Sequence, residues 1–179
     1  MILKFKNFIN LYEEEKIDIL EIRNSKYVRE NMSNDNIIEK NAHFNWIENL
    51  LNDQNSKYFA IFFDNKLQGS VYFNVNQQNE CFWGIYLDER SSAIISSLSA
   101  YIFLEFLINT MSIQKIFSSV KKNNSQALNF NKNFGFKIFK EDEDFFYLKL
   151  SKKVWENSKK SRLLKPIKRY LDKIEHYFE

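Results

Sequence analysis

Apolar positions recur along the chain with two different periods, and each period predicts one kind of element. Alternating or short apolar runs predict strands over residues 1–8, 80–87 and 114–120, a hairpin over 57–76, and two strands around an acidic turn over 136–150. Apolar side chains at helical spacing predict helices over residues 13–25, 39–53, 93–109 and 124–135. The third helix is apolar on most of its sides, so we expect it to be buried.

The order of these elements predicts an α/β domain. Strands and helices alternate through the centre of the chain, which favours parallel pairing in a mixed sheet whose faces are covered by helices. Residues 1–151 contain no internal repeat and no low-complexity linker, so we assign them to a single domain.

Residues 152–179 differ from this domain in charge and pattern. They carry nine Lys and Arg against four Asp and Glu, whereas the rest of the chain is slightly acidic. Their apolar side chains predict one stripe of an amphipathic helical tail, formed by Leu163, Leu164, Ile167, Tyr170, Leu171, Ile174, Tyr177 and Phe178.

Three roles are open for this tail. Because the stripe is continuous, we favour docking on the chain's own body, as an extra helix or as the contact of a homodimer. An anionic membrane surface is the second possibility, since basic amphipathic helices bind there. Nucleic acid ranks last, because the body is slightly acidic and has no known nucleic-acid motif; we expect no such partner.

Composition narrows the class of protein. Of 179 residues, 44% are hydrophobic and 17% aromatic, which predicts a compact core rather than a disordered chain. Cys81 is the only cysteine, so an internal disulfide is excluded and a cytoplasmic location is favoured. We find no N-terminal signal pattern, no uncharged apolar run long enough to span a membrane, and no metal-ligand spacing.

A strand-to-helix junction at residues 84–103 is the first candidate site. A helix that starts directly after a strand directs free backbone N–H groups at whatever lies in front of it, which suits an anion. The turn itself, residues 88–92, contains no glycine, although glycine usually lets the backbone approach a phosphate.

The order of elements, together with Asn124, Ala127, Gly135 and Phe136, resembles the GNAT acetyltransferase superfamily. The N-terminal half is similar to PseH-type enzymes, which acetylate the 4-amino group of a UDP-linked amino sugar. The similarity rests on Arg23-Asn24, Val28-Arg29, Met32, Ile37, His43, Trp46-Ile47 and Lys57-Tyr58-Phe59, with GIYL at 84–87 and EDEDFFYLKL at 141–150. It covers roughly residues 1–150.

This resemblance implies a GNAT fold in which the strand at 81–87 splays from the strand at 115–120. It implies acetyl-CoA as acyl donor, with the pantetheine arm bonded to backbone in the gap and the pyrophosphate at the next helix. The implied donor-site residues are Ile85, Tyr86, Leu87, Arg90, Ser91, Ser92, Ala93, Asn124 and Phe130. The implied acceptor-site residues are Arg23, Asn24, Arg29, Met32, His43 and Trp46.

For catalysis, the resemblance implies His43 or Glu80 as the base, acting directly or through water. Each also has a structural interpretation, as a packed histidine or as a solvated charge at a strand end. Ala93 and Ile95 replace the glycines of the superfamily's pyrophosphate turn. Asn131 replaces its general-acid tyrosine, and an amide cannot give up a proton at neutral pH.

Three functions therefore remain open. The first is an N-acetyltransferase acting on a nucleotide-linked amino sugar in bacterial surface or flagellar glycan synthesis. The second keeps the fold but acetylates a protein N-terminus. The third is a non-catalytic GNAT domain that binds a sugar nucleotide or a partner protein.

Overall fold

A computed structural model of the protein describes residues 1–161 and 164–179. The strands are β1 (Ile2–Asn7), β2 (Ser56–Phe63), β3 (Lys66–Gln77), β4 (Glu80–Leu87), β5 (Lys115–Lys121), β6 (Lys137–Glu141), β7 (Phe145–Ser151) and β8 (Glu175–Phe178). The helices are α1 (Glu13–Asn24), α2 (Lys26–Arg29), α3 (Lys40–Asn49), α4 (Ala93–Glu105), α5 (Ser125–Asn133), α6 (Lys152–Ser158) and α7 (Lys165–Leu171).

The elements predicted for residues 1–151 are confirmed, with small shifts at their ends. Asp64 and Asn65 form the hairpin turn with φ of 45° and 64°, the left-handed geometry of tight hairpins. Gly135 follows α5 with φ of 97°, as expected past a helix end. The short helix α2 was not predicted, because its four residues are too few to establish a period.

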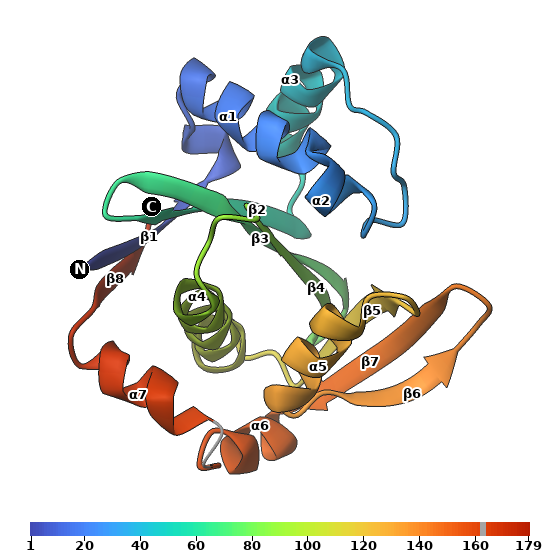
Figure 1. Ribbon diagram of the computed structural model, residues 1–179, viewed down its shortest axis with the longest axis vertical. Coiled ribbons are helices and arrows are strands. Elements are labelled where there is room, and N and C mark those ends of the chain that lie inside the picture. The colour runs from blue at the N-terminus through green and yellow to red at the C-terminus, as the bar shows by residue number, and fades with distance from the viewer. Residues whose placement is uncertain (162–163) are drawn as a thin grey trace.

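The strands form a single mixed sheet in the order β6-β7-β5-β4-β3-β2-β1-β8 (Figure 1). Pairing is parallel between β4 and β5 and between β1 and β8, and antiparallel elsewhere. The predicted parallel pairing at the centre of the sheet is therefore confirmed, and the fold class is α/β with a mixed sheet.

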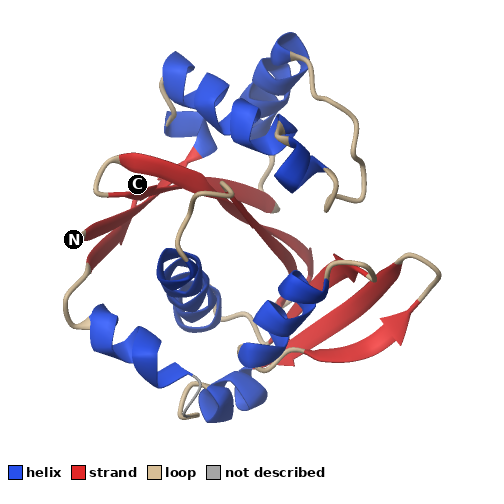
Figure 2. Ribbon diagram, in the orientation of Figure 1, coloured by secondary structure: helices blue, strands red, loops and turns tan. Residues whose placement is uncertain are grey.

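Helices cover both faces of the sheet. Figure 2 shows α1, α2 and α3 above it, and α4 to α7 below it. Alternation along β4 divides its side chains between the faces: Cys81, Trp83, Ile85 and Leu87 pack into the core around α4. Tyr86 packs into a smaller cluster with residues of α1 and α3.

β4 and β5 separate along their length. They pair only at Glu80–Lys115, Cys81–Ile116 and Phe82–Phe117. Beyond Phe82, β4 continues to Leu87 beside β3, and β5 continues to Lys121 beside β7. The sheet therefore opens into a gap between its two central strands, as expected from the superfamily resemblance.

The single helical stripe predicted for residues 152–179 is wrong. The segment forms α6, α7 and the strand β8, which pairs with β1 from Ile2–Glu175 to Phe5–Phe178. The apolar spacing over residues 174–178 is too short to distinguish a helix from a strand. The edge of β1 that β2 leaves unpaired offers backbone partners, and this favours a strand. Phe178 then stacks on Phe5 and on Phe106, with ring centroids 4.6 and 4.2 Å apart.

The apolar side chains of this segment lie in the chain's own core. Leu164, Ile167 and Ile174 are buried, and Leu171 and Phe178 pack against them. Tyr170 and Tyr177 are exposed instead, and Leu163 of the predicted stripe lies outside the described residues.

Helix α4 and its continuation to residue 110 are the central element of the core. Residues 93–110 are long and apolar enough to cross a membrane by length and composition alone. In the fold, Leu98 to Leu104 are buried between the sheet and α5–α7, which accounts for the apolar sequence.

Candidate functional site

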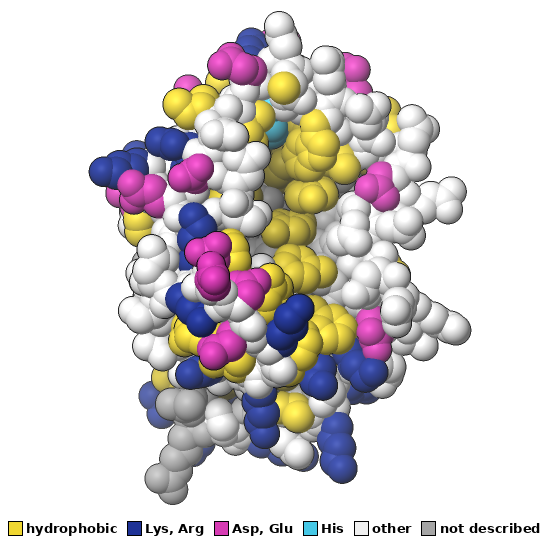
Figure 3. All heavy atoms as spheres, turned by 90° about the vertical axis from the view of Figure 1, so that its right-hand side faces the viewer, with side chains coloured by type: hydrophobic (Ala, Val, Ile, Leu, Met, Phe, Trp, Pro, Cys, Tyr) yellow, Lys and Arg dark blue, Asp and Glu magenta, His cyan; other side chains and the backbone are white. Residues whose placement is uncertain are grey.

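The gap between β4 and β5 opens at the same end of the sheet at which α4 begins. After Phe82, residues 83–87 of β4 have no strand partner on the β5 side. Figure 3 shows a hollow on this face of the molecule, with a band of hydrophobic side chains along it. An extended ligand that carries amide groups would find unpaired backbone there, as an added strand does.

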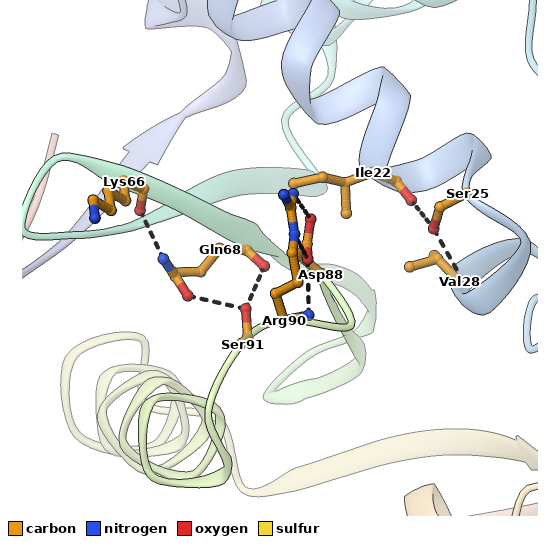
Figure 4. Close-up of polar contacts among 8 residues, drawn as sticks. All are labelled: Ile22, Ser25, Val28, Lys66, Gln68, Asp88, Arg90 and Ser91. Carbon is orange, nitrogen blue, oxygen red and sulfur yellow. Dashed lines mark hydrogen bonds and ion pairs between the residues drawn. The ribbon is translucent and has the colours of Figure 1, made fainter.

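The turn after β4 directs Arg90 away from the helix that follows. Arg90 donates from Nε and Nη2 to the two oxygens of Asp88, at 2.8 and 2.6 Å (Figure 4). Ser91 donates to the side-chain and backbone oxygens of Gln68 on β3, at 2.9 and 3.2 Å. The side chains of Arg90 and Ser91, which were predicted to contact the pyrophosphate, therefore already have hydrogen-bond partners within the protein.

The surroundings of Arg90 are acidic. It lines a pocket of about 460 Å³ with Asp18, Glu21, Asp88 and Glu89, between α1 and the turn. The guanidinium holds the pKa of Asp88 below its usual range through these hydrogen bonds. A pyrophosphate would be repelled by this set of carboxylates, so the pocket does not suit it.

The amino end of α4 keeps part of its anion-binding capacity. Ser92 caps the helix, because its Oγ accepts the Ile95 N–H at 3.3 Å. The helix offers no acceptor to the amides of Ala93 and Ile94, since its first N–H groups lack intrahelical partners. These two amides can meet a phosphate, and the Ser92 hydroxyl, which acts as acceptor in the cap, keeps its own O–H as a donor.

Helix α5 contributes Asn124, Phe130 and Asn131. Asn124 caps the helix, accepting the Ala127 N–H at 2.9 Å, and Phe130 is half-buried. Asn131 is buried and donates its Nδ2 to the Ala127 carbonyl at 2.9 Å, while its Oδ1 has no partner. One of the two N–H donors of the amide that replaces the tyrosine is thus already bound, and its Oδ1 acceptor has no partner.

Glu80 lies at the closed end of the gap. It accepts from Lys115 Nζ at 2.6 Å, across the point where β4 and β5 are still paired. The carboxylate is therefore part of an ion pair at the strand starts, and the structure does not bring it together with the amino end of α4.

Arg23, Asn24 and Arg29 all hold the segment that follows α2. Arg23 donates from Nη2 to the Asn34 carbonyl at 3.0 Å, and Arg29 from Nη1 to the Asp35 carbonyl at 2.7 Å. Asn24 exchanges two hydrogen bonds of 2.9 Å with the backbone of Ile38. Met32 lies in the same segment and is half-buried.

An aromatic wall stands between α3 and the gap, and it consists of Trp46, Tyr58 and Tyr72. Trp46 meets Tyr58 edge-on at 4.7 Å, and Tyr58 stacks on Tyr72 at 4.9 Å. Tyr72 lies opposite Gly84, and a Cβ at Gly84 would come within 2.5 Å of the Tyr72 ring. Glycine therefore allows this ring to lie flat on β4 where the gap opens.

Sequence reasoning found Trp46 but did not assign Tyr58 and Tyr72 to the site. Alternation along the predicted hairpin carried the necessary signal. It places Tyr58 and Tyr72 on the face opposite to Phe59, Val71 and Phe73, which pack around α4.

The electrostatics of this wall favour an anionic ligand. Arg23 lies near Tyr72, Tyr86 and the second cation, Arg29. Burial lowers the pKa of Arg23, and its Nη1 is buried without a hydrogen-bond partner. Burial raises the pKa of Tyr58 to about 12 and that of Tyr86 as well, so both hydroxyls stay protonated.

His43 lies on α3 against α1. It is 3% exposed, it packs against Trp46 at 5.8 Å, and its Nε2 has no hydrogen-bond partner. Burial lowers its pKa, so the imidazole is neutral near pH 7. His43 therefore contacts Trp46 of the aromatic wall, and it lies close to Lys16 of α1.

A sheet opened between two parallel strands, with a helix starting beyond the opening, defines an acetyltransferase fold. The profile of the acetyltransferase (GNAT) domain family matches residues 11–151. The protein belongs to this family and is an acetyl-CoA-dependent N-acetyltransferase. The unpaired backbone of β4 and the free amides of α4 fit the two polar parts of acetyl-CoA.

Among characterised relatives, the chain is similar to Acetyltransferase PseH of Campylobacter jejuni. The identity is 29% over 150 residues, which cover 82% of this chain and 92% of the relative. The crystal structure of Campylobacter jejuni PseH with acetyl coenzyme A matches with a TM-score of 0.70 at 24% identity, over 84% and 99% of the two chains. FdhC, a nucleotide-linked sugar GNAT, matches with a TM-score of 0.71 at 21% identity, over 88% and 89%.

The fold is also shared with GNAT enzymes of other specificity. Spermidine N-acetyltransferase from Vibrio cholerae matches with a TM-score of 0.74 at 12% identity, over 87% and 98% of the two chains. Because such distant similarity defines the fold alone, the acceptor has to be inferred from the site.

Proposed function

We propose that the protein transfers the acetyl group of acetyl-CoA to the amino group of a nucleotide-linked amino sugar. The proposal rests mainly on Arg23, whose guanidinium lies beside the aromatic wall. One of its N–H groups is buried there without a hydrogen-bond partner. A flat, apolar wall next to a cation suits a base or sugar ring attached to phosphate. Similarity to PseH supports the same acceptor class.

On the donor side, the backbone of Ile85 and Leu87 would hold the pantetheine arm along the unpaired side of β4. The amides of Ala93 and Ile94 would hold the pyrophosphate at the amino end of α4. Phe130 of α5 would cover the arm. Bound acetyl-CoA supplies the thioester carbonyl that the acceptor amine attacks.

On the acceptor side, Arg23 and Arg29 would bind the diphosphate of the nucleotide. Trp46, Tyr58 and Tyr72 would pack against the base or the sugar. His43, neutral at pH 7, would take the amine's proton through an intervening water, because the imidazole is buried. Glu80 is excluded from direct proton transfer in this proposal by its ion pair with Lys115.

The proton of the departing thiol would come from solvent. Asn131 donates to the Ala127 carbonyl and has no acidic proton of its own. Water in the open end of the gap would therefore protonate the thiolate, and the residue at position 131 would not contribute a pH-dependent step.

We place this reaction in the bacterial cytoplasm, where sugar nucleotides are built for surface or flagellar glycans that contain nonulosonic acids. The single, buried Cys81 agrees with a reducing compartment. A homodimer or a membrane contact through residues 152–179 stays a prediction. Most of the described apolar side chains of that segment pack into the chain's own core, which leaves its basic side chains and the exposed Tyr170 and Tyr177 for such a contact.

Two measurements test the proposal. Isothermal titration with acetyl-CoA should show binding, and its absence at millimolar concentration would remove the donor half. Product analysis should then compare a UDP-linked amino sugar with a peptide N-terminus as acceptor. Acetylation of the peptide alone would favour the N-terminal acetyltransferase, and binding of acetyl-CoA without transfer to either acceptor would favour a non-catalytic domain.

A further inference from the structure

Lys121 joins the two walls of the hollow. It is the last residue of β5, and its Nζ donates to the backbone carbonyl of Glu30, 2.8 Å away and 91 positions earlier in the chain. Among the side-chain hydrogen bonds of the described residues, it alone connects β5 with the helices above the sheet. The contact therefore links the end of β5 to the residue that follows α2, and Figure 1 shows α2 above β5.

The cation next to this contact is Arg29, and Arg23 lies close enough to Arg29 for their charges to interact. Arg23, Arg29 and Lys121 each donate to a neutral backbone carbonyl, those of Asn34, Asp35 and Glu30. Within residues 1–161 and 164–179, none of the three cations forms an ion pair with a carboxylate. Arg23 Nη1 and Arg29 Nε are also buried without an acceptor.

Three cations without a carboxylate form an incomplete site. A buried N–H donor that lacks an acceptor is costly, and a cation bonded only to carbonyls gains less than one bonded to an anion. Phosphate oxygens would satisfy the free N–H groups of both arginines and would replace the Glu30 carbonyl as the acceptor of Lys121.

We propose that Lys121 binds the diphosphate of the acceptor from the β5 side, opposite Arg23 and Arg29. This inference rests on the proposed function and names a residue that selects acceptors with a phosphate over neutral amino sugars. Lys121 is at once the bridge between the walls and a cation whose bonded acceptor is a neutral backbone carbonyl.

Direct binding of UDP tests this assignment without any need for turnover. Lys121→Gln should weaken UDP binding about 10- to 100-fold, the usual effect of losing a hydrogen bond to a charged group. Lys122→Gln is the matched control, because Lys122 pairs with Glu141 instead, at 3.7 Å. Equal affinity of the wild type and Lys121→Gln for UDP, or no UDP binding by the wild type at millimolar concentration, would overturn the inference.

Kinetics separate a phosphate contact from a purely structural bridge. Lys121→Gln should raise KM for the UDP-linked amino sugar by the same factor, leave KM for acetyl-CoA unchanged, and leave kcat/KM for the same amino sugar without nucleotide unchanged. Lys121→Arg should restore most of the lost affinity. An equal loss with both acceptors would assign Lys121 to loop positioning and contradict the proposal.

The two proposals fail in different ways. A wild type that binds UDP through Lys121 but acetylates no sugar nucleotide would refute the proposed function and leave this assignment intact. A wild type that acetylates the sugar nucleotide with no effect of Lys121→Gln would do the reverse.

Discussion

Gly84→Ala tests whether Tyr72 has to lie flat on β4 for the acceptor to bind. The added Cβ would lie 2.5 Å from Cζ and Oη of Tyr72 and 2.6 Å from Cε1. To reach an ordinary contact of about 3.5 Å, the ring must move by about 1 Å. It cannot move freely, because Tyr58 stacks on its other side at 4.9 Å.

The expected cost is that of a small-to-large change in a packed site, about 1–3 kcal/mol of unfolding free energy. The same displacement should raise KM for the acceptor, because Tyr72 is part of the aromatic wall. Chemical denaturation measures the first effect, and initial rates at varied acceptor and saturating acetyl-CoA measure the second.

A double-mutant cycle with Tyr72→Ala identifies the cause. Without the ring, the Cβ has no atom to displace, so Gly84→Ala should lose most of its cost in the Tyr72→Ala background. If the cost of Gly84→Ala is the same in both backgrounds, the clash with Tyr72 is not its origin and the reasoning fails.

Three further changes test other parts of the structure. Lys6→Met should lower the unfolding free energy, measured by chemical denaturation, by about 2 kcal/mol. The reason is that the buried Lys6 ammonium forms a 2.7 Å ion pair with Glu15. Arg90→Ala should change the Kd for acetyl-CoA less than about threefold by titration, since Arg90 is bound to Asp88 rather than to the donor site. His43→Gln should flatten the fall in stability below pH 6.5, because burial lowers the folded-state pKa of His43.

The sign of the histidine effect follows from proton binding. Well above pH 6.5 the imidazole is neutral in both states. As the pH falls through 6.5, the unfolded chain takes up a proton that the folded chain resists, so stability falls with acid. An unchanged pH profile for His43→Gln would contradict this.

Two controls complete the set. Lys4→Met is the control for Lys6, because Lys4 is 3.7 Å from the exposed Glu179, and it should have less effect. Arg90→Ala could instead weaken acetyl-CoA binding as much as the loss of a phosphate contact would. That result would show that Arg90 binds the donor.

Much of the candidate site follows from spacing and resemblance. The opening of β4 from β5, the start of α4 and the position of Asn131 could be predicted because they depend on element order. The partners of individual side chains could not. Arg90 is three positions past the end of strand β4, in a turn that allows its side chain more than one direction, and the carboxylate of Asp88 binds it.

The segment after α2 shows the same limit. Arg23, Asn24 and Arg29 were predicted to face the acceptor, and in the structure each bonds the backbone between residues 34 and 38. Residues 30–39 are polar and have no hydrophobic period, so the sequence does not predict which residues they contact. Those contacts depend on the packing of the helices on either side.

The sequence by itself determined the elements of the first 151 residues other than α2, and the buried α4, because hydrophobic period and turn chemistry act over a few neighbouring residues. It also determined the family, through the resemblance of its motifs. Only the tertiary structure decided that residues 175–178 form β8, that Tyr72 lies on Gly84, and that Lys121 reaches Glu30. Each depends on a partner distant in sequence: a free strand edge, a position without a Cβ, and an opposite wall.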